Sequence, residues 1–474
     1  MKKLRLAFLA VFVIAIIAVA GIVGVYYYDK NQNRDSTPVK SVAQAIGDLS
    51  SSVKDPFVTE YDLPSASSLP NAIAVDSSGN VWTVLQNDTS LGMLNPSTGS
   101  LEQYRLPGLK TGTGLSSWGL AVDNTNHMVW FTEEISNAIW SFNWTSQTFS
   151  EHLLKTPAAL PYQVALDAKG NAWFTEFSGD KIGVVPTKGA VTEYSIPISP
   201  SEPTGIAVDK QSGRVWFNLL QTSGASDEFF VGSLNNGSFT FNNITPEVDT
   251  PVGIAVGLNG TLWLTQHGAS FVSEFNPQTR YFKTISTSIP PVGASYPYFV
   301  SVDPSTGNVW FNEHYGNAIS MFNPKSNSLT EYEIPSRNPA DGNISGALTM
   351  SLTSNGVPWF TELYDGKLGS VNTSSRLGLS INVSSPVFTM ANSSSVQVQL
   401  SIVGSSTSEI NLSASVGNFT GQFQFNFTRF FGIGNYSTPL TITNAGSPPG
   451  VYFVTISAAT QNVIVSQIIE LRCT

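Results

Sequence analysis

The chain has one cysteine, four histidines and few charged residues. Among 474 residues, Asp, Glu, Lys and Arg make up only 12%, which is about half of the usual share in soluble proteins. A single cysteine, Cys473, excludes an intramolecular disulfide. We expect it to be an incidental thiol, with an intermolecular disulfide as the alternative. The net charge is −10, and no basic block occurs after residue 5, which argues against a nucleic-acid partner.

The sequence motifs of several common active sites are also missing. The chain contains no serine-nucleophile elbow, no His-Glu-x-x-His zinc motif, no P-loop and no dinucleotide fingerprint. The apolar share of 41% is nevertheless that of a globular chain. Its length of 474 residues allows two or three domains. A function therefore has to be sought in features that are specific to this chain.

An uncharged, mostly apolar segment follows the basic residues at the N-terminus. The run from Leu6 to Tyr28 has 23 residues, enough to cross a bilayer of about 30 Å at 1.5 Å per residue. We therefore expect residues 1–28 to be an uncleaved transmembrane helix, with the basic flank inside and the rest extracellular. A cleaved signal segment is the alternative, because Ala18-Val-Ala20 resembles a signal-peptidase site.

A tryptophan recurs seven times after the same kind of lead-in. An apolar strand of the Gly-Ile-Ala-Val-Asp type, a turn with Gly or Asn and a short apolar run precede each ring. The spacings of 43 to 49 residues and the strand patterning are typical of a β-propeller with one blade per repeat. We expect these large rings to pack between neighbouring blades. They are Trp82, Trp130, Trp173, Trp216, Trp263, Trp310 and Trp359.

Each repeat predicts four strands. In the third repeat they are expected at Gln163–Asp167, Ala172–Glu176, Lys181–Val185 and Val191–Ile196. An aspartate ends the first strand of most repeats, and we expect its side chain to cap the hairpin turn that follows. The recurring residues are Asp76, Asp123, Asp167, Asp209 and Asp303.

The last repeat has no fourth strand of its own. A matching stretch, Val58 to Pro64, stands before the first repeat. It is predicted to pair with the last blade and close the ring, which removes an exposed sheet edge. The propeller is thus predicted over residues 56–375. It follows a linker or stalk over residues 29–55, in which a short helix is expected around residues 39–49.

Residues 376–474 differ in composition and are predicted to form a second domain. Val396, Val398 and Leu400 alternate with polar residues, as in a half-buried strand. About seven or eight short strands over roughly 100 residues are typical of an immunoglobulin-like β-sandwich. The Cys…Trp…Cys core of antibody domains is lacking, so the prediction concerns the wider sandwich architecture.

The second domain is also rich in N-glycosylation sequons. Each of the seven asparagines from Asn372 to Asn435 is followed by x-Ser or x-Thr. We expect N-linked glycans there, which require an extracytoplasmic location. The predicted acceptors are Asn87, Asn143, Asn236, Asn243, Asn259, Asn343, Asn372, Asn382, Asn392, Asn411, Asn418, Asn426 and Asn435.

The residues after four of the tryptophans carry a family resemblance. Trp-Phe-Thr-Glu or Trp-Phe-Asn-Glu begins at Trp130, Trp173, Trp310 and Trp359. With lead-ins such as Pro203-Thr-Gly-Ile, these repeats resemble those of the streptogramin B lyases, also called virginiamycin B lyases. The resemblance implies a seven-bladed propeller. It also implies enzymes that open a cyclic depsipeptide by elimination at its ester bond, aided by Mg²⁺.

The resemblance implies catalytic histidines at the start of the first strands of the last two blades. The corresponding residues of this chain are Tyr298 and Ala347, and no blade start carries a histidine. The acidic, metal-associated residue of the family has its match in Glu362. The departure argues against the antibiotic-opening activity of the family.

First strands begin and second strands end on the same face of a propeller, so their side chains form a predicted ligand-binding mouth. Within it, Glu313 and Glu362 could hold Mg²⁺ or Ca²⁺, and Glu362, His314 and Glu313 are the catalytic candidates. Alternatively, the repeated glutamate accepts hydrogen bonds from the neighbouring blade and has a purely structural role. The mouth residues are Trp118, Glu133, Tyr162, Glu176, Gln266, His267, Tyr298, Glu313, His314 and Glu362.

Three functions remain open at this point. The first is a membrane-anchored, outward-facing glycoprotein whose propeller binds a cell-surface protein or a small molecule, or serves as a scaffold. The second is a metal-dependent extracytoplasmic lyase or hydrolase. The third is a component of a cell-surface layer or filament, as low charge and glycosylation suggest.

Overall fold

The described part of the chain consists mainly of β-strands and the turns between them. The computed structural model describes residues 39–41, 43–48, 51–109, 114–221, 227–245, 248–287, 294–375, 377–402, 409–416 and 419–474. In this part of the chain the only helices are the 3₁₀ turns η1 (Ala66–Ser68) and η2 (Pro339–Asp341). No helix within these ranges is long and apolar enough to span a bilayer. The predicted anchor at residues 1–28 lies outside the described residues.

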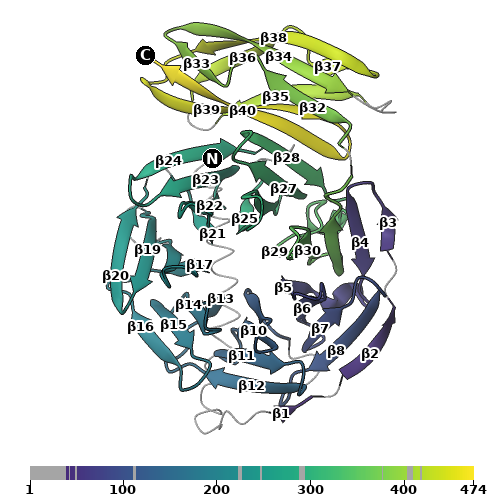
Figure 1. The fold of residues 1–474 in the computed structure, drawn as a ribbon, viewed down its shortest axis with the longest axis vertical. Coiled ribbons are helices and arrows are strands. Elements are labelled where there is room, and N and C mark those ends of the chain that lie inside the picture. The colour runs from purple at the N-terminus through teal and green to yellow at the C-terminus, as the bar shows by residue number, and fades with distance from the viewer. Residues whose placement is uncertain are drawn as a thin grey trace.

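Seven antiparallel sheets follow one another around a ring, with the first strand of each nearest the centre (Figure 1). Blades 1 to 3 consist of β5 (Pro70–Val75), β6 (Val81–Leu85), β7 (Ser90–Leu94), β8 (Ser100–Arg105), β9 (Leu120–Asp123), β10 (Met128–Glu133), β11 (Ala138–Asn143), β12 (Thr148–Leu153), β13 (Pro161–Leu166), β14 (Ala172–Glu176), β15 (Lys181–Val185) and β16 (Thr192–Ser195). The strands predicted for the third repeat are confirmed to within two residues.

The remaining blades repeat this order. Blades 4 to 7 consist of β17 (Pro203–Val208), β18 (Val215–Leu219), β19 (Phe230–Asn235), β20 (Ser238–Asn243), β21 (Pro251–Val256), β22 (Leu262–Gln266), β23 (Phe271–Asn276), β24 (Tyr281–Ser286), β25 (Pro297–Val302), β26 (Val309–Glu313), β27 (Ala318–Asn323), β28 (Ser328–Glu333), β29 (Met350–Leu352), β30 (Pro358–Glu362) and β31 (Lys367–Val371). Blade 7 has only three strands from its own repeat.

The repeated tryptophans are core residues, as predicted. All are buried except Trp173, which is half-buried. The repeated aspartates hold the turns that follow them: Asp76 accepts the backbone N–H groups of Ser78 and Asn80, both at 2.9 Å. The Trp82 indole also donates to Asp76, at 3.1 Å. One carboxylate thus fixes both the turn and the ring behind it.

Neighbouring blades are joined by the residue before the repeated glutamate. The hydroxyl of Thr132 donates to the carbonyl of Tyr162 in the next blade at 3.1 Å. Thr175 and Thr265 do the same toward blades 4 and 6, both at 2.8 Å. The predicted structural alternative placed this role on the glutamate. The structure corrects it, because the threonine points toward the next blade, whereas the glutamate is held within its own blade.

The N-terminal segment runs around the outside of three blades. Its strands are β1 (Val39–Lys40), β2 (Ala43–Asp48), β3 (Ser51–Lys54) and β4 (Val58–Asp62). Strand β4 pairs with β31 and supplies the missing fourth strand of blade 7, as predicted. Strands β1, β2 and β3 extend blades 2, 1 and 7 outward.

The short helix expected around residues 39–49 is therefore wrong. Strands β1 and β2 occupy that segment because the outer edges of β12 and β8 offer unpaired backbone groups, which outweigh a weak local preference for helix. For the same reason, the predicted stalk over residues 29–55 is partly incorporated into the ring.

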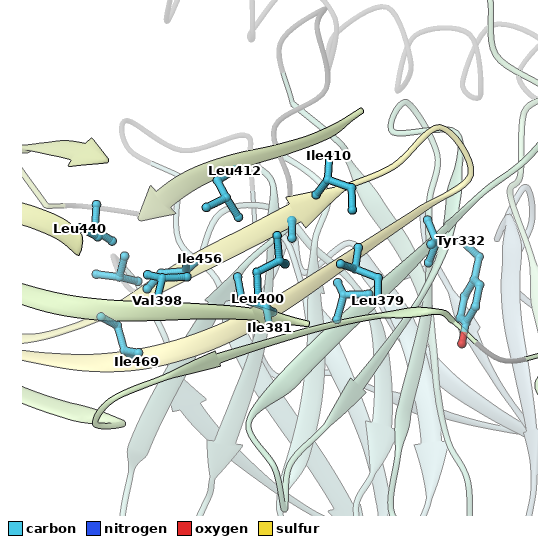
Figure 2. Packing of buried hydrophobic residues seen from close by; sticks show 14 of the residues in the cluster. Tyr332, Leu379, Ile381, Val398, Leu400, Ile410, Leu412, Leu440, Ile456 and Ile469 are labelled. Carbon is cyan, nitrogen blue, oxygen red and sulfur yellow. The ribbon is translucent and has the colours of Figure 1, made fainter. Parts of the chain in front are cut away.

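The C-terminal region forms two facing sheets. Its strands are β32 (Leu379–Val383), β33 (Val387–Met390), β34 (Ser393–Ile402), β35 (Ile410–Val416), β36 (Gly421–Phe425), β37 (Arg429–Phe430), β38 (Gly434–Asn444), β39 (Gly450–Ala459) and β40 (Val463–Cys473). One sheet has the order β32-β34-β38-β36. Apolar side chains of both sheets gather in one core (Figure 2), for example Leu400 of β34 and Ile456 of β39. Cys473 is buried at the end of β40.

The second C-terminal sheet is continuous with blade 6. Strand β40 pairs antiparallel with β28 from Ser328↔Gln467 to Tyr332↔Val463, so the first part of β40 lies beside the outer strand of that blade (Figure 1). The Thr455 hydroxyl donates to the carbonyl of Ser286 in blade 5 at 2.7 Å. The predicted second domain is thus joined to the ring by backbone pairing.

Candidate ligand-binding face

Two tyrosines meet across the centre of the predicted mouth. Tyr162 begins blade 3 and Tyr298 begins blade 6, and their hydroxyls are hydrogen-bonded to each other. Both side chains are buried, and burial is the main reason that their pKa values lie above the ordinary value of tyrosine. The ring of Trp118 lies 5.9 Å from Tyr162 and 6.2 Å from Tyr298. We call these three residues the aromatic plug.

The aromatic plug borders a cavity between the inner strands. The cavity is lined by the residues that directly follow the three plug residues in the chain, namely Gly119, Gln163 and Phe299. Glycine and apolar residues of blades 4 and 5 complete the lining. The inner strands can approach one another because some positions carry no side chain. A Cβ at Gly119, for example, would lie 2.7 Å from the backbone nitrogen of Val164.

Blades 5 to 7 surround the plug with further aromatic rings. His267 and His314 follow the second strands of blades 5 and 6, and their ring centroids lie 6.0 Å apart. Tyr298 lies 5.1 Å from His267, and Tyr364 of blade 7 lies 6.4 Å from His314. Burial lowers the pKa of His267 to about 4 and that of His314 to about 3. Both imidazoles are therefore neutral at neutral pH.

The repeated glutamates lie inside the blades. In blade 7, the carboxylate of Glu60 on β4 accepts from Lys367 at 3.2 Å and from the backbone and hydroxyl of Ser336 at 2.9 and 2.7 Å. The neighbouring Glu362 is fully buried. Burial and the charge of Glu60 raise its pKa well above the ordinary value, against the effect of Lys367. The protonated form of Glu362 is therefore favoured.

Blade 3 repeats this arrangement. Glu193 on β16 accepts from Lys181 at 3.1 Å and from the Thr156 hydroxyl at 2.8 Å. Burial and the charge of Glu193 raise the pKa of Glu176 to about 8. The pKa of Glu193 itself is lowered, because its hydrogen bonds and Lys181 outweigh its burial. A lysine thus neutralises one carboxylate and a proton neutralises the other.

Blade 6 has the two carboxyl groups without the lysine. The residue opposite Glu313 on β27 is Ala318. The Ser320 hydroxyl donates to Glu313 at 2.5 Å. Burial and the charge of Glu331, which also hydrogen-bonds Glu313, raise the pKa of Glu313 well above the ordinary value. The pair in blade 6 therefore shares one proton, so that it carries one negative charge instead of two.

The other two mouth residues of this type are also held within their blades. Glu133 accepts the backbone N–H groups of Ser116, Ile135 and Ser136. Gln266 accepts from the Asp249 backbone at 3.1 Å and donates to Ser273 at 2.6 Å. Burial of both side chains leaves them little access to a ligand in this arrangement.

The predicted mouth therefore divides into two groups. The structure brings Trp118, Tyr162, His267, Tyr298 and His314 together at the face. It places Glu133, Glu176, Gln266, Glu313 and Glu362 within separate blades. Among the residues that the structure describes, no group of three or more His, Cys, Asp or Glu side chains is arranged to hold a metal ion. Glu313 and Glu362 in particular are each surrounded by groups of their own sheet.

The partners of these glutamates were not among the predicted site residues. Glu60, Glu193 and Glu331 occupy the same position in the outer strands, in the recurring motif Thr-Glu-Tyr. That motif was a usable signal, because Glu193 is in register with Gly183, which has no side chain, and with Phe174. Phe174 is two positions from Glu176, so Glu176 lies on the same face of the sheet. Glu134 was also missed; it accepts from the Ser116 hydroxyl at 2.6 Å, and burial raises its pKa to about 8.

The predicted glycosylation acceptors can be placed as well. All of them within the described ranges are exposed except Asn143, which is half-buried in a turn where it accepts the backbone N–H of Thr145 at 3.0 Å. Asn418 lies outside the described residues. Asn382 and Asn435 lie on the sheet β32-β34-β38-β36.

Comparison with known proteins identifies the type of fold. Residues 39–226 match the model of the virginiamycin B lyase family. A virginiamycin B lyase from Nocardia farcinica is 25% identical over 177 residues, which are 37% of this chain and 56% of that protein. The match thus spans little more than half the length of this relative.

Solved structures extend the likeness around the ring. A streptogramin B lyase structure superimposes with a TM-score of 0.57 at 24% identity, covering 66% of this chain and 97% of that chain. A virginiamycin B lyase from Staphylococcus aureus gives a TM-score of 0.56 at 22% identity, with coverage of 66% and 98%. A catalytically inactive variant of the S. aureus enzyme, crystallised with quinupristin, gives 0.57 at 22% identity. At these identities, the likeness establishes the fold.

The ring of sheets is therefore a β-propeller. More particularly, it is a virginiamycin B lyase-like propeller, and the resemblance inferred from the repeats is confirmed.

Proposed function

We propose that this propeller is a binding or scaffold module rather than a catalyst. The observation that carries the proposal is the hydrogen bond between Tyr162 and Tyr298. Tyr298 stands where the family resemblance implies a catalytic histidine, and a tyrosine with a raised pKa is a poor general base at neutral pH. The second such position is Ala347, which has no proton to transfer.

The surface around the aromatic plug suits a ligand with apolar and polar parts. Trp118, Tyr296, Tyr315 and Tyr364 are half-buried there, so each offers an apolar ring face together with a polar group. Such amphipathic rings are enriched at binding surfaces. A small molecule or an exposed loop of a cell-surface protein fits these properties.

We further propose that the module is carried on the outside of the cell as a membrane-anchored, N-glycosylated protein. Support comes from the apolar N-terminal segment and from the exposure of the sequon asparagines. The C-terminal sheets would act as an immunoglobulin-like spacer. Deglycosylation of the native protein should increase its gel mobility, and an unchanged mobility would contradict this part of the proposal.

The absence of lyase chemistry can be tested with a streptogramin B antibiotic. The purified chain is incubated with quinupristin and Mg²⁺, and ring opening is followed by liquid chromatography, with a virginiamycin B lyase as positive control. We expect no product above the rate without protein. Ring opening that is lost in Glu362→Gln would contradict the proposal and favour the alternative.

That alternative is a metal-dependent lyase or hydrolase with Mg²⁺ or Ca²⁺ at the mouth. Its support is the likeness to a propeller crystallised with quinupristin and the presence of Glu362 at the matching position. Against it stand the burial of Glu362 and its pairing with Glu60 inside blade 7. A bound proton on Glu362 would have to leave before a hard cation could bind there.

A further inference from the structure

The two histidines of the face occupy equivalent positions on adjacent blades. His267 directly follows β22, and His314 directly follows β26. Their ring centroids are 6.0 Å apart, and their planes differ by 11°. The same position in the other blades carries Gln86, Glu134, Phe177, Leu220 and Leu363. Two of the four histidines of the chain thus meet at the boundary between blades 5 and 6.

The state of both rings suits coordination of a metal ion. Burial keeps the imidazoles neutral, as described above, so a ring nitrogen lone pair is available at neutral pH. His267 hydrogen-bonds the backbone of Tyr296 and Pro297. Because a proline backbone can only accept, His267 is the donor there. A histidine that donates one ring N–H to a backbone carbonyl is oriented as metal ligands commonly are.

The ring nitrogens of His314 are buried without a hydrogen-bond partner among the described residues. Its side chain is only 5% exposed, and neither of its ring nitrogens has a hydrogen-bond partner in the described part of the chain. A buried polar group without a partner costs roughly 1–3 kcal/mol. Its neighbours include the rings of Tyr298, Tyr315 and Tyr364, which contact the imidazole through their ring faces or edges and do not hydrogen-bond it. A ligand that binds a ring nitrogen would remove this cost.

We propose that His267 and His314 form a two-imidazole site for a divalent transition-metal ion, for which Zn²⁺ is the natural candidate. Imidazole nitrogen suits Zn²⁺, Ni²⁺ and Cu²⁺, whereas Mg²⁺ and Ca²⁺ take oxygen ligands. Two rings bound to one ion at about 2.0–2.1 Å from each nitrogen have centroids roughly 5 to 6 Å apart. The observed 6.0 Å lies at the upper end of that range, so a small rotation of the rings suffices.

This site differs from the one expected at Glu313 and Glu362. Those carboxyl groups lie inside their blades, and the histidines lie above them at the face. Only two protein ligands take part, so the remaining coordination positions are open to water or to a ligand of the face. The proposal holds whether the face binds a small molecule, a protein or neither.

The test is isothermal titration calorimetry of the full chain with ZnCl₂, after removal of metal with a chelator. We expect one Zn²⁺ per chain, and MgCl₂ should give no heat of binding under the same conditions. His267→Gln and His314→Gln should each weaken Zn²⁺ binding at least tenfold. The matched control is His127→Asn, which changes an exposed histidine in a turn at φ 56°, where asparagine is well tolerated.

Several outcomes would overturn the proposal. They are no saturable Zn²⁺ binding by the unmodified chain, binding that survives either substitution at the face, or binding lost in His127→Asn. Because glutamine at buried position 314 could disturb folding, the unmodified chain is also examined with Cu²⁺ by electron paramagnetic resonance. Hyperfine splitting from two ring nitrogens is expected; splitting from one or none would contradict the site.

Discussion

Blades 6 and 7 contain the same pair of buried glutamates but neutralise it differently. In blade 7, Lys367 lies 3.2 Å from Glu60, and Glu362 keeps its proton. In blade 6, Ala318 stands where the lysine would be, and Glu313 and Glu331 share a proton. The comparison shows that a repeated residue type does not imply a repeated charge state. The neighbour across the strand decides it, because an unpaired buried carboxylate is costly.

The difference also bears on function. A carboxyl group that is buried inside its own sheet and has a raised pKa is not available to a substrate at the face. Glu313 and Glu362, the strongest acidic candidates from the sequence, are both of this kind. The half-buried groups of the face are mainly aromatic side chains such as Trp118 and Tyr364, which is why we propose binding rather than catalysis.

Removal of the lysine from blade 7 should cause the largest loss of folding stability. Lys367→Met leaves Glu60, whose side chain is fully buried, without its cation. Breaking a fully buried ion pair costs about 3–5 kcal/mol. Since Lys367 is 16% exposed, we expect a loss of about 2–3 kcal/mol in the free energy of unfolding. Urea denaturation measures it, with the exposed turn residue Lys169→Met as control. An unchanged urea midpoint in Lys367→Met would show that the lysine does not stabilise blade 7, and would contradict the proposed difference in charge between blades 6 and 7.

A smaller effect is expected when a carboxyl group is replaced by an amide. Glu60→Gln removes the charge that Lys367 requires, although Asp62 at 3.2 Å remains as a partner, so we expect a loss of about 1–2 kcal/mol. Glu331→Gln in blade 6 removes only a group that shares a proton, and its cost should stay within about 0.5 kcal/mol. Equal losses in both variants, measured by urea denaturation at pH 7, would contradict the proposed difference in charge.

The ion pair between lysine and glutamate is more exposed in blade 3 than in blade 7. Lys181 is 25% exposed and contacts Glu193, which is 5% exposed. Because solvent screens this pair more strongly, Lys181→Met should cost about 1 kcal/mol. The ratio of this loss to that of Lys367→Met tests whether burial sets the strength of the pair. A larger loss in blade 3 would mean that another contact of Lys181 dominates.

Much of the ring could be predicted from the sequence, because its signals are local. The spacing of the tryptophans gives the repeats, and the match between Val58–Pro64 and the outer strands predicts the pairing of β4 with β31. The turn role of Asp76 follows from its position before a hairpin. Each of these inferences depends on a short motif that can be compared between repeats.

The remaining features depend on contacts between distant segments. Strands β1 and β2 have only two and six residues, and they are strands because blades 2 and 1 offer free edges. The pairing of β28 with β40 joins residues more than 130 positions apart. The bond between Tyr162 and Tyr298 requires two blades to meet across the ring. No pattern within a single repeat indicates any of these contacts.

The role of the glutamates was predicted only in part. The structural alternative predicts hydrogen bonds from the neighbouring blade to these glutamates. The actual partners, Glu60, Glu193 and Glu331, are one strand removed, and the charge balance depends on whether residue 181, 318 or 367 is a lysine. Position in the repeat was therefore predictable, whereas ionisation was not.

The most direct test of the shared proton in blade 6 is the pH dependence of stability above pH 7, where unfolded histidines are already neutral. The folded-state pKa of Glu313 is raised, so the folded chain holds a proton that the unfolded chain has released. Stability is then full below the unfolded pKa and falls as pH rises toward the folded pKa.

The measurement is the free energy of unfolding from pH 7 to 8.5, for the unmodified chain and for Glu313→Gln. Loss of one bound proton should make the decline of the variant shallower by about 1.4 kcal/mol per pH unit. Identical slopes would show that Glu313 is ionised in the folded chain, and would contradict a proton shared between Glu313 and Glu331.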